Sequence, residues 1–153
     1  MQVISAGDVD HNRTAKRTER MSVDYDAVEA SYDRCLEDAG FFDTFYDLFL
    51  VKSDEIPPLF ANTDFRKQKQ VVRLSVRMMI RLGEGRPETV HAIEKLGELH
   101  SSRDRNVRPE LYRLWLDTLC ECVKRSDPEY TPELEQKWRD TMQPGIDMMI
   151  AMY

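Results

Sequence analysis

A histidine at residue 100 stands where an apolar helical stripe ends, and histidine is the commonest side chain that binds a metal ion. Within the segment HAIEKLGELHSSRD, spacings of three and four residues place Ile93, Leu96 and His100 on one face of a helix. His91 precedes His100 by nine residues, which is half a turn around the helix, so it should face solvent. Because histidine also caps helices and satisfies hydrogen bonds in cores, a ligand role and a structural role are both open for His100.

Tyr46 is a second candidate, because its hydroxyl group lies within a face that is otherwise aromatic. Phe42, Phe45 and Phe49 follow one another at spacings of three and four, and Tyr46 falls inside the same stripe. Most stripes of this kind form a packed core. The hydroxyl nonetheless gives this apolar wall one group that can donate or accept a hydrogen bond.

Two glutamines in the segment DFRKQKQVVRLSVRMMIRLG have different predicted environments. On a helical wheel with Phe65 at 0°, Gln68 falls at about 300° and Val72 at about 340°. Gln70 falls at about 140°, among the arginines, and should face solvent. Gln68 is either buried with a hydrogen-bond partner or lies at the rim of the core. Three further apolar side chains fall between about 180° and 240°, which predicts a broad apolar arc: Val71, Leu74 and Met78.

The segments that carry these candidates all show helical patterns. No stretch alternates with the period of two that marks a strand, and no hairpin signal is present. Glycines mark the expected helix ends, and prolines mark several first helical turns. The expected elements are a short turn at 54–60 and helices at 24–40, 41–52, 64–83, 86–100, 108–125 and 131–153. The predicted fold class is therefore all-α, with about seven helices. Pro144 and Gly145 interrupt the last segment, so its second half is expected to kink or end early.

Length and composition exclude several classes of function. A chain of 153 residues is about the size of one domain, and its net charge of −6 argues against nucleic acid as a partner. No apolar run approaches the roughly 20 residues that span a bilayer, and the N-terminus resembles no secretory signal, so a cytoplasmic location without membrane contact is expected. The three cysteines form no disulfide framework. Residues 1–22 are polar and without periodicity, and they are expected to form a mobile arm before a domain at 23–153.

Five segments in a fixed order carry a family resemblance. They are FYDLFLVKSDEIPPLF, ANTDFRKQ, LGELH, VRPELYRLW and EQKW, and together they resemble a bacterial single-domain globin. The resemblance covers residues 24–153 and rests on the combination and spacing of the segments rather than on any one of them. It implies a globin-like fold of about seven helices that encloses a haem pocket, with haem b as the cofactor.

The resemblance also implies roles for individual residues. His100 matches the proximal histidine that ligates the haem iron, and Tyr46 and Gln68 match residues that contact the bound ligand on the distal side. Gln70 is the alternative distal residue if the preceding corner aligns differently, although the wheel disfavours it. The residues that would contact the haem are Phe60, Phe65, Val72, Leu96, Val107 and Tyr112. The implied small ligands are O2, NO or CO, and the protein would be a monomer or a homodimer.

Several functions remain open for such a pocket. Reversible binding of a diatomic gas is the plainest, and no catalytic residue is assigned. Conversion of NO and O2 to nitrate is the runner-up, and it would need a separate reductase because the chain has no nicotinamide-binding motif. Gas sensing through a partner protein and a helical interaction bundle without a cofactor are further alternatives. Met79 as a second axial ligand is disfavoured because it fits ordinary core packing, and no inward-facing Glu-x-x-His pair supports a carboxylate metal site.

Overall fold

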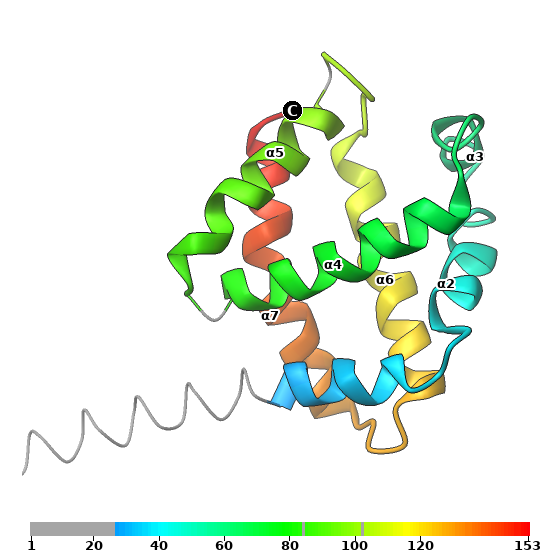
Figure 1. The fold of residues 1–153 in the computed structure, drawn as a ribbon, viewed down its shortest axis with the longest axis vertical. Coiled ribbons are helices and arrows are strands. Elements are labelled where there is room, and N and C mark those ends of the chain that lie inside the picture. The colour runs from blue at the N-terminus through cyan, green and yellow to red at the C-terminus, as the bar shows by residue number, and fades with distance from the viewer. Residues whose placement is uncertain (1–26, 84, 102) are drawn as a thin grey trace, which may run out of the picture.

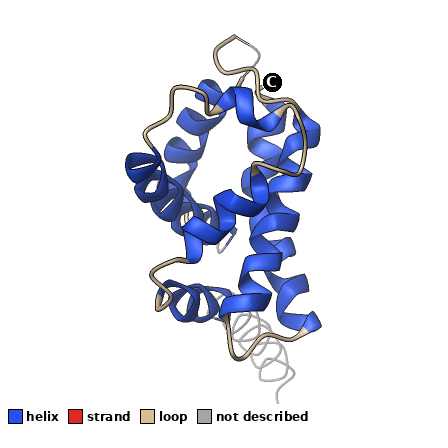
Figure 2. Ribbon diagram, turned by 90° about the vertical axis from the view of Figure 1, so that its right-hand side faces the viewer, coloured by secondary structure: helices blue, strands red, loops and turns tan. Residues whose placement is uncertain are grey.

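The computed structural model describes residues 27–153 with the exception of residues 84 and 102, and every regular element in this part of the chain is helical (Figures 1 and 2). A helical segment at residues 27–36 precedes the numbered elements. These are α2 (Phe41–Phe49), α3 (Ile56–Leu59), α4 (Phe65–Gly83), the 3-10 turn η1 (Pro87–Thr89), α5 (Val90–His100), α6 (Pro109–Ser126) and α7 (Pro132–Ala151). The all-α prediction is confirmed. The mobile arm predicted for residues 1–22 lies outside the described residues.

The long helices α6 and α7 pack against each other and form the base on which the other helices rest (Figure 1). Helices α4 and α5 both contact α7, and α2 contacts α6. Two glycines let α4 and α5 approach α7 closely. A Cβ atom at Gly83 would collide with the carbonyl oxygen of Thr141, and one at Gly97 would lie 2.5 Å from the sulfur of Met152. The absence of a side chain at these two positions therefore allows the short distance between each helix and α7.

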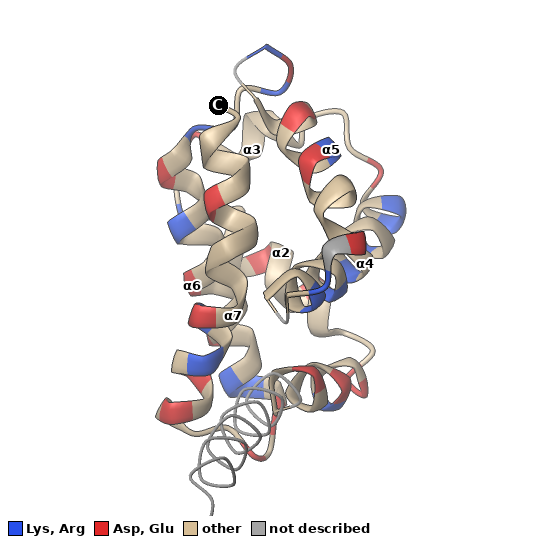
Figure 3. Cartoon of the chain, turned by 90° about the vertical axis from the view of Figure 1, so that its left-hand side faces the viewer, with Lys and Arg blue, Asp and Glu red and all other residues tan. Residues whose placement is uncertain are grey.

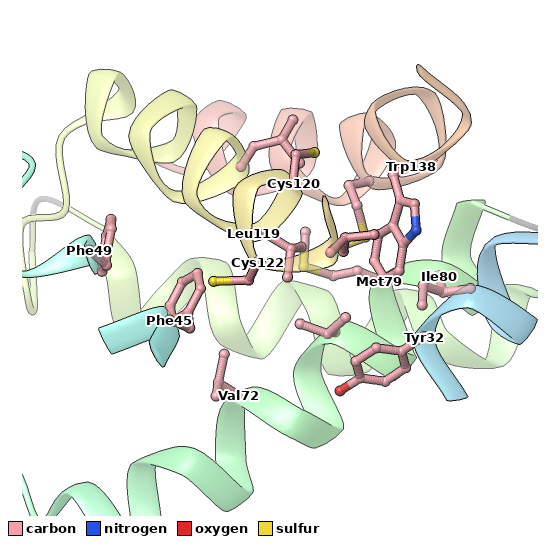
Figure 4. Close-up of a cluster of buried hydrophobic side chains, with 14 of the residues drawn as sticks. Tyr32, Phe45, Phe49, Val72, Met79, Ile80, Leu119, Cys120, Cys122 and Trp138 are labelled. Atoms are coloured by element: carbon pink, nitrogen blue, oxygen red, sulfur yellow. The ribbon is translucent and has the colours of Figure 1, made fainter. Parts of the chain in front are cut away.

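The core between these helices is aromatic and sulfur-rich (Figure 4). Trp138 and Phe45 are fully buried, and Met79 packs in the same cluster against Gly145 of α7. The three cysteines are free and buried. Burial raises the pKa of the Cys35 thiol to about 12, so this thiol stays protonated and unreactive at neutral pH.

A buried polar network ties the 27–36 segment to the corner between α6 and α7. The Ser31 hydroxyl donates to Asp127 at 2.6 Å, and the Arg34 guanidinium donates to the same carboxylate at 2.7 Å and 3.0 Å. The indole N–H of Trp138 donates to the Ser31 hydroxyl oxygen at 2.9 Å. The Asp127 side chain is completely buried, so its charge is compensated by these donors rather than by solvent.

The early end expected for the last helix is wrong, whereas the kink that was its alternative stays a prediction. Helix α7 continues through Pro144 to Ala151 instead of ending early. Pro144 has no N–H to donate to the carbonyl of Asp140. Both residues are exposed, so solvent can form a hydrogen bond to that carbonyl instead. The apolar arc of α4 is also narrower than predicted, because Val71 and Leu74 are 48% and 65% exposed.

None of the helices in the described part of the chain is both long and apolar enough to cross a membrane.

Candidate functional site

His100 is the last residue of α5, and its ring is held by the helix itself. Its Nδ1 atom lies 2.7 Å from the carbonyl oxygen of Leu96. Because a carbonyl oxygen only accepts, Nδ1 carries the hydrogen and donates it. The other ring nitrogen, Nε2, then keeps its lone pair, and no described residue makes a hydrogen bond to it. The four-residue spacing from Leu96 to His100 was the sequence signal for this contact, but it does not show which ring nitrogen is bound.

Burial favours the neutral form of His100. Desolvation lowers the pKa of the imidazole, while the hydrogen bond to the Leu96 carbonyl acts in the opposite direction and is the weaker effect. The ring is therefore neutral at physiological pH, and a neutral imidazole is the form that ligates a metal. His91, in contrast, has a side chain that is 77% exposed, as its place on the wheel predicts.

Val107 and Tyr112 lie next to His100. The Val107 N–H donates to the His100 carbonyl at 2.9 Å, which closes the turn after α5. The Tyr112 ring, on α6, is buried and tilted by 41° to the imidazole, with 6.5 Å between the ring centroids. Leu96, Val107, Tyr112 and His100 thus form one group, and the structure brings together four of the residues that the sequence singled out.

Tyr46 and Gln68 form the centre of a second group. The side-chain amide of Gln68 donates to the Tyr46 hydroxyl oxygen at 3.1 Å, so the half-buried Gln68 has the partner that its wheel position required. Burial raises the pKa of Tyr46 to about 12, although the bond from Gln68 lowers it somewhat. The hydroxyl is thus protonated at neutral pH, and its own hydrogen is not used by Gln68. Gln70 is exposed, as predicted.

Two phenylalanines enclose the Tyr46 ring. The ring centroids of Phe60 and Phe65 lie 5.7 Å and 5.3 Å from that of Tyr46, both in edge-on contact. Phe60 and Phe65 stack on each other at 5.9 Å. Val72, one turn after Gln68, is 5% exposed, and Figure 4 shows it on the side of α4 that faces Phe45. The second group therefore consists of one hydroxyl and one amide within an aromatic and aliphatic wall.

The two groups lie on different helices. Helices α4 and α5 are joined by the short connection around η1 and separate from there (Figure 1). Gln68 lies in the first turn of α4 and His100 at the end of α5, so both lie on the ends far from the connection. No hydrogen bond or ring contact joins the two groups within residues that the structure describes. The arrangement presents, in one group, an imidazole nitrogen to which no described residue forms a hydrogen bond and, in the other, a hydroxyl donor.

Other features of the molecule do not form an alternative metal site. Among the described residues, no cluster of three or more His, Cys, Asp or Glu side chains could hold a metal ion. An open groove of about 500 Å³ lies between α6 and α7, and it includes Tyr112, Leu116 and Ile146. This groove contains neither His100 nor Tyr46. Met79, the disfavoured second ligand, is 1% exposed and lies in the core.

Comparison with known proteins gives a consistent result. A family model described as Globin matches residues 44–149. The crystal structure of protein PA3967 from Pseudomonas aeruginosa PAO1, described as structurally highly homologous to a human hemoglobin, superimposes with a TM-score of 0.81. The two chains share 37% sequence identity, and the match covers 85% of this chain and 98% of that one. No curated protein matches the chain.

Proposed function

This chain belongs to the globin family, and we propose that it holds haem b through His100 and reversibly binds O2 or another diatomic gas beside Tyr46. The family and the fold imply a haem-binding globin. The identity of the cofactor, the ligating residue and the gas are the parts proposed here.

The observation that carries the proposal is the state of His100. Its Nδ1–H is bound to the Leu96 carbonyl at 2.7 Å, which fixes the orientation of the ring and leaves the Nε2 lone pair for a metal. A second-sphere hydrogen bond of this kind is typical of histidines that ligate metals, and it increases the basicity of the free nitrogen. With one such nitrogen and no metal-binding cluster among the described residues, His100 suits an iron whose other ligands come from a porphyrin.

The walls around His100 and Tyr46 suit a flat, largely apolar cofactor. Val72 and Tyr112 are buried, whereas Phe60, Phe65, Leu96 and Val107 are partly buried at the edge of the core. Side chains of this type can contact a porphyrin ring and restrict the access of water to its iron. The donor set and the lining of the site therefore both fit haem.

When bound, haem supplies an iron with an open coordination position, and the distal side chains decide how a ligand is held there. Tyr46 offers a hydroxyl hydrogen, because Gln68 donates to the oxygen of this hydroxyl and does not compete for its hydrogen. One N–H of Gln68 is committed to Tyr46, which leaves the second N–H of the same amide for the ligand. Tyr46 is thus the principal donor, and Gln68 positions it and adds a second hydrogen bond.

Spectrophotometry of the purified ferrous protein tests reversible gas binding. We expect O2 to change the visible spectrum. Removal of O2 under vacuum should restore the ferrous spectrum, and exchange with CO should replace the O2 spectrum by that of the CO complex, over several cycles. Full oxidation of the iron on the first exposure to O2 would contradict a binding role.

NO dioxygenation is the second candidate, because the same pocket can hold O2 next to incoming NO. Each turnover combines one NO, one O2 and one electron to give nitrate. The sequence contains no Gly-rich nicotinamide-binding motif, and the described part of the chain contains no strand on which one could sit.

We therefore expect the purified protein with O2 and NADH to consume about one NO per haem and then stop. An NO electrode measures this directly. Many turnovers without any other protein would show that electrons enter through this chain itself and would overturn the binding proposal in favour of an enzyme.

A further inference from the structure

Helix α4 carries a charge opposite to that of the whole chain. All of its charged residues are cationic, whereas the chain has 22 Lys and Arg against 28 Asp and Glu. Figure 3 shows blue Lys and Arg segments on the ribbon of α4. The six are Arg66, Lys67, Lys69, Arg73, Arg77 and Arg81. A positive stripe of this kind on an acidic protein attracts a negatively charged partner to one defined surface.

Only part of this charge is neutralised within the molecule. Lys69 pairs with Asp43, and Arg77 pairs with acidic residues of the 27–36 segment. Arg66, Lys67 and Arg73 are exposed, and none of the residues that the structure describes forms an ion pair with them. Three cations of α4 thus point to solvent without an internal partner in the described chain.

Exposed apolar side chains lie among these cations. Val71 and Leu74, two members of the broad apolar arc predicted for this helix, are 48% and 65% exposed. We call the surface formed by these residues and their neighbours the α4 outer face. It consists of Arg66, Lys67, Gln70, Val71, Arg73 and Leu74. A small apolar centre with a charged rim is the composition of a protein–protein interface.

We infer that the α4 outer face docks an acidic protein that donates electrons to the haem iron, an inference that rests on the proposed function. The opposite face of α4 carries Gln68 and Val72. A partner on the outer face is therefore separated from the gas-binding side by about one helix diameter, roughly 10–12 Å. In the step, the donor loses one electron and ferric iron gains one, and no bond forms or breaks. The step returns oxidised iron to the ferrous form that binds O2.

Two other occupants fit the surface less well. An interfacial helix inserts a wide apolar face into lipid, but the wide apolar face of α4, which includes Val72, Val76 and Ile80, is buried in the core. A second copy related by a two-fold axis through α4 would bring its cations against the same cations. An acidic protein surface meets neither obstacle.

The test uses flavodoxin, a small acidic flavoprotein that transfers single electrons, as the probe. Lys67→Glu removes a positive charge and adds a negative one, and Gln70→Lys adds a positive charge. Both positions are exposed, and the original and the new residues are all good helix formers. Lys124→Glu on α6 makes the same change in net charge as Lys67→Glu at an exposed position on another helix. Calorimetry gives the dissociation constant of the complex, and stopped-flow absorbance gives the rate of iron reduction.

At low ionic strength we expect Lys67→Glu to weaken binding and slow reduction about 3- to 10-fold, and Gln70→Lys to have the opposite effect. Lys124→Glu should leave both quantities close to those of the wild type, and added salt should erase the differences. Equal effects of Lys67→Glu and Lys124→Glu would overturn the inference. The inference would also be overturned if binding to anionic phospholipid vesicles changed among the α4 variants while binding to flavodoxin did not.

Dithionite separates this inference from the proposed function. Dithionite is a small anion, so in added salt that screens surface charge it should reduce the wild type and all three variants at the same rate, which shows that haem is present and reducible. If dithionite reduces the protein but the rate of reduction by flavodoxin does not depend on the α4 charges, only the docking surface is contradicted. A protein that takes up no haem contradicts the proposed function.

Discussion

At the scale of single residues, a hydrogen bond joins Tyr46 and Gln68, and we propose that the two side chains act together on a bound gas. Gln68 donates to Tyr46, so in the proposed function the hydroxyl hydrogen of Tyr46 would remain for a bound gas. Tyr46→Phe keeps the ring and its contacts with Phe60 and Phe65 but removes the donor. Loss of one hydrogen bond of about 0.5–1.5 kcal/mol should raise the O2 dissociation rate by up to about tenfold, as measured by stopped-flow release.

Gln68→Leu should also accelerate O2 release, because it removes one donor and frees Tyr46 to rotate. Gln70→Leu is the matched control, since residue 70 is exposed on the other side of the same helix. The same stopped-flow measurement should show almost no effect for this variant. A large effect at residue 70 with none at 68 would mean that the distal residues are assigned to the wrong face of α4.

The sequence was sufficient to separate these two glutamines, because two residues along a helix turn by about 200°. It could not supply the partner of Gln68, which lies 22 residues away on another helix. The same limit applies to His100. Its four-residue distance from Leu96 allows a contact, but only the structure shows that Nδ1 makes it.

At the scale of the elements, Gly83 sets the distance between α4 and α7. A Cβ at this position meets the backbone of Thr141, which cannot move aside as a flexible side chain could. We expect Gly83→Ala to lower the free energy of unfolding by about 1–3 kcal/mol. Thermal melting followed by circular dichroism measures the loss. Gly40→Ala is the control, since its Cβ would come no closer than 3.4 Å to a side-chain atom, and an equal loss in both variants would contradict the close crossing.

The Asp127 network makes the attachment of the 27–36 segment dependent on pH. Burial would raise the pKa of this carboxyl, but the hydrogen bonds from Arg34 and Ser31 and from the Glu129 amide outweigh it and hold the pKa below its ordinary value. A lowered pKa stabilises the fold at pH values above the unfolded pKa of about 3.9, and this contribution disappears as pH falls through the folded value.

Asp127→Asn should therefore reduce the free energy of unfolding at pH 7 by about 3 kcal/mol, because Arg34 loses its buried partner. The difference from the wild type should begin to shrink below about pH 4, where the unfolded carboxyl takes up a proton, and should shrink further as pH falls through the lowered folded pKa. Denaturant unfolding at several pH values provides the measurement. A difference that is constant from pH 7 to pH 3 would show that the charge of Asp127 contributes nothing.

Some helix ends were predictable from local chemistry, but the end predicted at Gly40 is wrong, because the helical segment ends at residue 36. The environment of helix faces was not predictable. Pro109 and Pro132 begin α6 and α7, and Gly83 ends α4, as their residue types predict. Val71 and Leu74 are apolar and suitably spaced, yet they are exposed. A pattern within one helix shows which side chains share a face, but tertiary packing decides which faces are covered.

At the scale of the whole molecule, the order of the segments predicted the fold correctly. The helical pattern alone gave the all-α class, and the resemblance gave the globin arrangement that the comparison structure bears out. Long-range polar contacts could not be obtained in this way. Ser31 forms hydrogen bonds with Asp127, 96 positions away, and with Trp138, 107 positions away. Nothing in the type or local spacing of these residues predicts that they are partners. Oligomeric state, as monomer or homodimer, stays a prediction.

Haem binding through His100 is the central claim, and the visible absorption spectrum tests it most directly. The purified protein, supplied with haem, should show an intense Soret band with one haem per chain. His91→Ala should leave this spectrum unchanged, because His91 faces solvent. His100→Ala should lose the bond to iron, with a shifted or absent Soret band. Absence of haem uptake by the wild type, or a spectrum that changes with His91→Ala and not with His100→Ala, would contradict the account.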